Sequence, residues 1–172
     1  MTYPSLRHAM LVLAGTILLA CGVCARAGDG SERGFHLSSL ALLQPQALFG
    51  KRVSVDDVVT LTDAIVATAG GWSSELDPAQ NADACSVFVA VRPDRRLKTW
   101  TSCRSFDGTA LDQRISGEVD GNRIPKVKGL IVYAIHGKES GMDAFPDAWK
   151  AALEGSKDAV EISAIVDKVW PE

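Results

Sequence analysis

Two cysteines, Cys85 and Cys103, have the clearest potential for chemistry in this chain of 172 residues. Residues 85–92, CSVFVAVR, alternate in side-chain character as a strand does, and so do residues 97–103, LKTWTSC. Pro93-Asp94 between them is a turn signal. We therefore expect a β-hairpin that brings the two sulfur atoms together.

One register of this hairpin allows both a disulfide and a cross-strand aromatic pair. If Cys85 lies opposite Cys103, then Phe88 lies opposite Trp100 on the other face of the ribbon, close enough for a cross-strand aromatic pair. The cysteines then form a disulfide, which stabilises the fold by about 3 kcal/mol. A redox or nucleophilic cysteine is the weaker alternative, because residues 28–172 contain no Cys-x-x-Cys and no histidine lies nearby in sequence.

Residue types that serve catalysis or metal binding are few and scattered. His36 and His136 are far apart and belong to no spaced metal motif, so we predict no metal and no cofactor. Glu75, Asp77 and Asp83 precede the hairpin as carboxylates of a solvated loop. No G-x-S-x-G, P-loop or dinucleotide fingerprint occurs, so an enzyme would need a dispersed site, which we hold as an alternative only.

A cluster of basic residues marks the turn of the hairpin. It consists of Arg92, Arg95 and Arg96, with Lys98 just beyond. This cluster is either a solvated hairpin end or a contact for an acidic partner or lipid headgroups.

The amino terminus has the pattern of a secretory signal peptide. Residues 9–20, AMLVLAGTILLA, form an apolar run that is too short to span a bilayer, and Ala25-Arg26-Ala27 suits a signal peptidase. We expect residues 1–27 to be removed and the protein to be periplasmic or secreted. Cys21 ends a sequence like a lipobox, so a lipid anchor on the outer membrane stays an alternative, as does an uncleaved membrane anchor.

The composition of the mature chain excludes one class of partner. The whole chain has 18 Lys and Arg against 21 Asp and Glu, and the leader holds only Arg7 and Arg26 of these, so the mature protein carries 16 basic against 21 acidic residues. A net charge of about −5 does not suit nucleic acid, whose phosphates need clustered cations. The remaining length of about 145 residues suits one domain.

Hydrophobic periodicity predicts an α+β domain. A third strand is expected at 130–135, LIVYAI, whose continuous apolar run indicates burial on both faces. With the hairpin it makes a small three-stranded antiparallel sheet packed by helices. The expected helices cover residues 54–69, 109–120, 145–154 and 157–169.

The division of the chain follows from these elements. Residues 1–27 are the signal peptide, residues 28–50 are a lead-in segment of uncertain structure, and residues 51–172 form the single domain. The oligomeric state stays open.

The middle of the chain resembles the carboxy-terminal domain of the TonB/TolA family of periplasmic energy-transducing proteins. The resemblance rests on residues 85–137: the hairpin, the turn Ser105-Phe106-Asp107-Gly108, the helix start Ala110-Leu111-Asp112-Gln113 and the stop Arg123-Ile124-Pro125. Arg95 stands where this family has a glycine. The chain also lacks the family's proline-rich spacer, so the resemblance implies a fold and a mode of binding, not energy transduction.

That mode of binding is strand addition, in which an extended peptide pairs with an open sheet edge. The two candidate edges are residues 97–103 and residues 130–135, the latter presenting Leu130, Val132 and Ala134. A covered, purely structural edge is the alternative for both.

These observations lead to one functional hypothesis with two alternatives. We expect an exported bacterial envelope protein that binds a protein or an extended peptide. The alternatives are a secreted inhibitor or immunity-type protein and a periplasmic enzyme.

Overall fold

The computed structural model describes residues 34–104, 106–140, 145–154 and 161–171. The signal peptide, with Cys21, lies outside these residues, and so does the predicted start of the last helix at 157–160.

In the part of the chain that the structure describes, four strands form one antiparallel sheet: β1 (Leu37–Leu42), β2 (Cys85–Val91), β3 (Leu97–Cys103) and β4 (Ile131–Gly137). Their order across the sheet is β1-β4-β2-β3. The α+β class is therefore confirmed, but the prediction of three strands is wrong. The missed strand, β1, falls inside the segment 28–50 and pairs with β4, about 95 residues further along the chain.

Five α-helices occur within the described residues: α1 (Gln46–Arg52), α2 (Val55–Ser73), α3 (Thr109–Glu118), α4 (Asp147–Glu154) and α5 (Ile162–Val169). α2 begins as predicted, because the Ser54 hydroxyl accepts the Asp57 backbone N–H in an N-cap. It does not end before Gly70 but continues through Gly70-Gly71 to Ser73. The buried Trp72 in its last turn holds this extension against the core.

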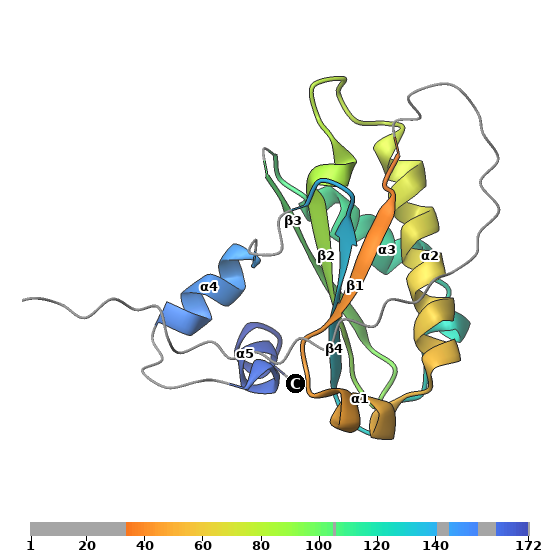
Figure 1. Cartoon of the computed structure of the whole chain (residues 1–172), viewed down its shortest axis with the longest axis vertical. Helices are drawn as coiled ribbons and strands as arrows, with labels where there is room; N and C mark the ends of the chain where they lie inside the picture. Colours follow the sequence, from red (N-terminus) through yellow and green to blue (C-terminus); the bar gives the residue numbers. More distant parts are fainter. Residues whose placement is uncertain (1–33, 105, 141–144, 155–160, 172) are drawn as a thin grey trace, which may run out of the picture.

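The sheet lies between two layers of helices (Figure 1). On one face, α2 and α3 cover a core that includes Val87 and Val89 of β2 and Tyr133 of β4. On the other face, Trp149 of α4 and Ile165 of α5 belong to a second core cluster. All seven residues of β4 are buried, as expected for a strand with helices on both sides.

The hairpin has the predicted register. Cys85 pairs with Cys103 and Phe88 pairs with Trp100, and the sulfur atoms of the two cysteines are bonded. The Phe88 ring packs against Trp149 with 5.2 Å between centroids, as does the Trp100 ring. The disulfide therefore fixes one end of a hairpin whose aromatic face is a main part of the second core.

Candidate functional site

The two outer strands of the sheet, β1 and β3, are its two edges. β4 is hydrogen-bonded to β1 on one side and to β2 on the other. The expectation that residues 130–135 form an edge is therefore wrong. Val132 and Ala134 are also fully buried, so neither is available to a partner.

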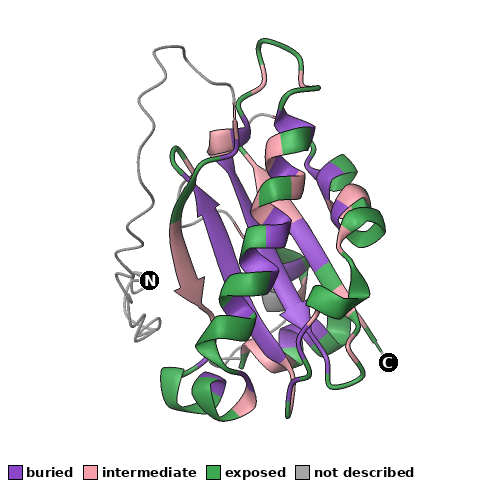
Figure 2. Ribbon diagram, turned by 90° about the vertical axis from the view of Figure 1, so that its right-hand side faces the viewer, coloured by how far each residue is buried: buried purple, intermediate pink, exposed green. Residues whose placement is uncertain are grey.

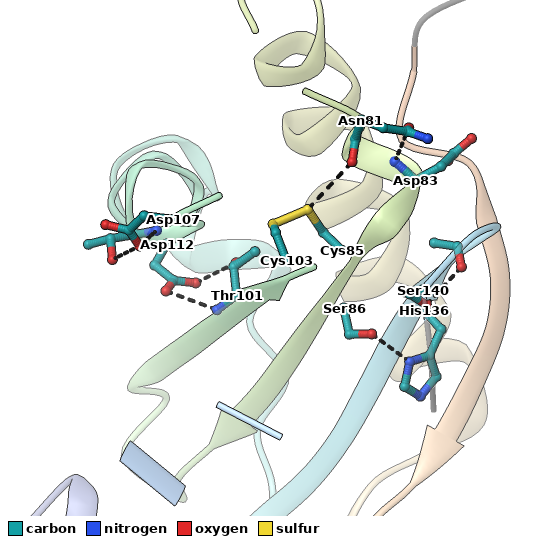
Figure 3. Close-up of a disulfide and its surroundings, with 12 residues drawn as sticks. Asn81, Asp83, Cys85, Ser86, Thr101, Cys103, Asp107, Asp112, His136 and Ser140 are labelled. Carbon is teal, nitrogen blue, oxygen red and sulfur yellow. Dashed lines mark hydrogen bonds between the residues drawn. A yellow bond between two sulfur atoms is a disulfide. The ribbon is translucent and has the colours of Figure 1, made fainter. Parts of the chain in front are cut away.

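The edge at β3 is covered by the protein itself around Thr101. Asp112 of α3 accepts the Thr101 backbone N–H at 3.0 Å and the Thr101 hydroxyl at 2.7 Å (Figure 3). The chain after β3 also packs closely here, since a Cβ atom on Gly108 would lie 2.9 Å from the Thr101 carbonyl oxygen. Burial raises the pKa of Asp112, although the Thr101 hydrogen bonds oppose this shift. A carboxylate placed in this way blocks strand addition at Thr101.

The edge at β1 has no such cover among the residues that the structure describes. Leu43 N–H bonds to the Val132 carbonyl, so the alternation of an antiparallel ladder directs Ala41 toward β4 and directs Leu40 and Leu42 away from it. The backbone N–H and C=O groups of Leu40 and Leu42 thus face outward. We call the outer side of Leu37–Leu42 the β1 edge.

The large hydrophobic side chains exposed in the described structure all belong to β1 or to the two helices that follow it. They are Leu37 at 45%, Leu48 at 37%, Val55 at 61% and Val59 at 37% exposure. Leu37 begins β1, and Leu48 lies in α1, which joins β1 to α2.

Helical geometry places the α2 valines toward β1. The residues of α2 that face the sheet include Val58, Leu61 and Ile65. At 100° per residue, Val55, Val59 and Val66 lie roughly 90° to one side of these, and Ala64 and Thr68 lie on the other side. We call Val55, Val59 and Val66 the valine flank.

The contacts of α2 show which of its two flanks faces α3 and which faces β1. Ala64 and Thr68 share a hollow of about 230 Å³ with Val119 and Arg123, which follow α3. The valine flank therefore faces away from α3. The Thr62 hydroxyl lies 3.4 Å from the Tyr133 hydroxyl, which places α2 over β4, the neighbour of β1. In Figure 2, β1 is the pink strand at the left, and it lies beside α2 rather than beneath it.

The basic turn makes contacts mostly within the chain. The buried Arg92 donates to the Trp170 carbonyl and to Asp167, and its guanidinium lies 4.4 Å from the Trp170 ring centroid. Arg95 donates to the carbonyls of Gly121 and Ile124.

The two remaining cations of the turn are exposed. Arg96 pairs with Asp94, and Lys98 lies on β3. The first two cations of the turn therefore attach the hairpin to other parts of the fold, and the last two face solvent.

Ser86 and His136 lie side by side on the two central strands of the sheet, near the end that holds the disulfide. The Ser86 hydroxyl is 2.8 Å from His136 Nδ1 (Figure 3), and burial lowers the pKa of His136. This pairing resembles a nucleophile and its base, but Ser86 has no exposed surface. A substrate therefore has no path to the hydroxyl, and the pair satisfies two buried polar groups.

His36 is held by Asp83 at the start of β1. The Asp83 carboxylate accepts the His36 backbone N–H at 2.6 Å and lies 3.0 Å from His36 Nδ1. Within the described ranges, no three His, Cys, Asp or Glu side chains gather closely enough to hold a metal ion. Among the helices of the described residues, none combines the length and the hydrophobicity that a membrane-spanning segment needs.

Comparison with family models, with curated proteins and with solved structures finds no match to this chain. The β1 edge and the valine flank are therefore identified from the geometry alone. Sequence reasoning missed them because the strand itself was missed. The signal that was present is the absence of charge between His36 and Lys51, which is unusual for an exposed segment.

Proposed function

We propose that this protein is an exported binding module of the bacterial envelope that takes up an extended segment of a partner protein as a fifth strand on β1. The observation that carries the proposal is the position of the exposed hydrophobic side chains of the described structure, which lie on β1, α1 and the start of α2. Exposed apolar surface beside an unpaired sheet edge is typical of strand addition.

The resemblance to the TonB/TolA family supports the same mode of binding but not the same strand. That resemblance covers residues 85–137, whereas β1 lies before them. An inhibitor or immunity-type protein would use the edge against an enzyme, and the identity of the partner would separate that role from a constitutive envelope contact.

Export is the second part of the proposal. The leader sequence supports it, and a disulfide between Cys85 and Cys103 suits an oxidising compartment. The intact mass of the exported protein, measured with and without reductant, tests it. Cleavage after Ala27 and two missing protons are expected, and retention of residues 1–27 by a cytoplasmic, reduced protein would refute it.

Strand addition is tested by hydrogen exchange on Leu40 and Leu42. Peptides of about nine residues are selected on the mature protein from an unbiased library. Binding should protect the amides of Leu40 and Leu42, which have no partner in the sheet, and leave that of Ala41 unchanged. Selected peptides that leave both outward amides unprotected would refute the proposal.

A proline variant supplies the matched control. Leu40→Pro removes an outward N–H without breaking the ladder to β4, since proline is tolerated on edge strands, and Leu40→Ala removes the same side chain but keeps the N–H. Loss of one backbone hydrogen bond and the clash of the proline ring should weaken peptide binding at least tenfold, about 1.4 kcal/mol. Equal binding by the two variants would contradict the proposal.

A further inference from the structure

We infer that the segment bound at the β1 edge is basic and carries large apolar side chains at alternate positions. This inference rests on the proposed function, and it concerns the chemistry of the partner rather than the place of binding.

The face of β1 that is turned toward α2 is the reason to expect large apolar side chains at alternate positions of the bound segment. Leu40 and Leu42 pack against the core beneath α2 but remain partly exposed. Side chains of an added strand alternate between the two faces of the sheet, so every second residue would lie beside these leucines. Only a large apolar side chain at such a position also reaches Val55 and Val59, which are exposed above it.

The opposite face of β1 favours small or polar side chains in the partner. Ser39 and Ala41 are the β1 residues on that side, and Ala41 packs against the second core cluster. Small neighbours give a large side chain little to pack against. The other half of the partner's residues is therefore expected to be small or polar, which makes the segment alternate.

The charges on β1 and α2 are the reason to expect a basic segment. β1 contains no charged residue, and α2 contains three carboxylates and no cation. Asp57 accepts the Ser54 hydroxyl at the start of the helix. Asp56 and Asp63 are exposed, and helical geometry places them next to the valine flank on its solvent side. Two cations, Lys51 and Arg52, end α1, so the part of the edge beside Asp56 and Asp63 is the part that would attract a cationic segment.

The same charges argue against a second copy of the protein as the occupant. Two β1 edges paired antiparallel around a two-fold axis would bring the two α2 helices together on the same face of the joined sheet. The exposed carboxylates Asp56 and Asp63 of both copies would then lie on the same face of the joined sheet. Like charges destabilise such a contact, so a foreign basic segment suits the surface better.

Three matched synthetic peptides of nine residues test the inference. The first alternates leucine and threonine between two terminal lysines, the second has glutamates in place of the lysines, and the third has the composition of the first with its leucines in one block. The first should bind at least tenfold more tightly than either of the others at low salt, and its advantage over the second should shrink at high salt.

Charge-reversal variants of the protein provide a second test of the inference. Asp63→Lys should remove or invert the preference for lysine over glutamate, whereas Asp147→Lys, the same charge change on α4, should leave it unaltered. No binding by any peptide, equal binding by all three, or the same effect from both variants would overturn the inference.

The two proposals fail separately. If Leu40→Pro abolishes peptide binding that shows no charge preference, the inference about the partner is wrong and strand addition stands. If Leu40→Pro binds the peptides as well as Leu40→Ala does, strand addition itself is wrong. A dimer in analytical ultracentrifugation that Leu40→Pro dissociates would assign the edge to a second copy and overturn the inference.

Discussion

Replacing Asp112 with alanine tests whether one side chain keeps the β3 edge closed. The Asp112 carboxylate accepts two hydrogen bonds from Thr101, at 3.0 and 2.7 Å. Hydrogen bonds to a charged group contribute about 1.5–3 kcal/mol each. Two effects reduce the loss: water can reach the partly exposed Thr101, and the desolvated charge disappears. We therefore expect Asp112→Ala to lower the free energy of unfolding by about 2 kcal/mol.

The pH dependence of stability gives an independent check on Asp112. Its pKa is raised in the folded state, so the folded protein takes up this proton at a higher pH than the unfolded chain does. The free energy of unfolding therefore gains a favourable contribution as the pH falls through the folded pKa toward about 3.8. Asp112→Asn lacks this contribution, so the free energy of unfolding of the wild-type protein should rise relative to that of Asp112→Asn as the pH falls from 7 toward about 3.8.

Urea unfolding of the two variants and of Thr101→Val measures these effects. A double-mutant cycle between positions 101 and 112 should give a coupling energy of about 1 kcal/mol or more. Sedimentation then shows whether the uncovered β3 edge begins to self-associate in Asp112→Ala. A loss below about 0.5 kcal/mol, the scatter of surface substitutions, with no coupling would refute the idea that Asp112 closes this edge.

Three further predictions concern the rest of the fold. Replacing Cys85 and Cys103 together with alanine should lower the free energy of unfolding by about 3 kcal/mol in urea titrations, because the bridge closes a loop with a separation of 18 residues. Arg95 has a positive φ of 64°, so Arg95→Gly should be about 1 kcal/mol more stable than Arg95→Ala in the same assay. Burial lowers the pKa of His136, so the free energy of unfolding should decrease as the pH drops below about 6.5, the pKa in the unfolded chain. In His136→Gln this contribution is absent, so the free energy of unfolding should decrease less over the same pH range.

The hairpin was predictable because its information is local. Seven residues of alternating character, a Pro-Asp turn and seven more leave one register in which the two cysteines meet, and that register also pairs Phe88 with Trp100. The start of α2 was predictable for the same reason, since Ser54 and the carboxylates after it form an N-cap within one turn of helix.

β1 was not predictable from its own residues. Its sequence, LSSLAL, has serines at neighbouring positions and a leucine at each end, so it lacks a strict alternation of polar and apolar residues. The chain also makes a bulge between Leu37 and Ser39, which shifts the faces by one residue. Its place in the sheet depends on β4, which lies far along the chain, and no local pattern carries such a pairing.

The role of the basic turn depends equally on distant residues. Arg92 is a surface residue by its position in a hairpin turn, yet it is buried because Trp170, near the end of the chain, stacks on its guanidinium. Arg95 takes the left-handed backbone conformation that favours glycine, and its hydrogen bonds to two distant carbonyls offset that cost. Only the fold shows that these two cations bind their own chain.

The helices that cover the β3 edge of the sheet leave the β1 edge uncovered by α2 and α3. Strands lie about 4.8 Å apart and a helix is about 10 Å wide, so two helices side by side span roughly four strands. Here α3 packs against β3, close enough to the β3 edge for Asp112 to accept the Thr101 backbone N–H. α2 then lies over β4, and β1 extends beyond it. Because exposed edges are commonly protected by charges and β1 has none, we expect a partner strand to pair with the β1 edge.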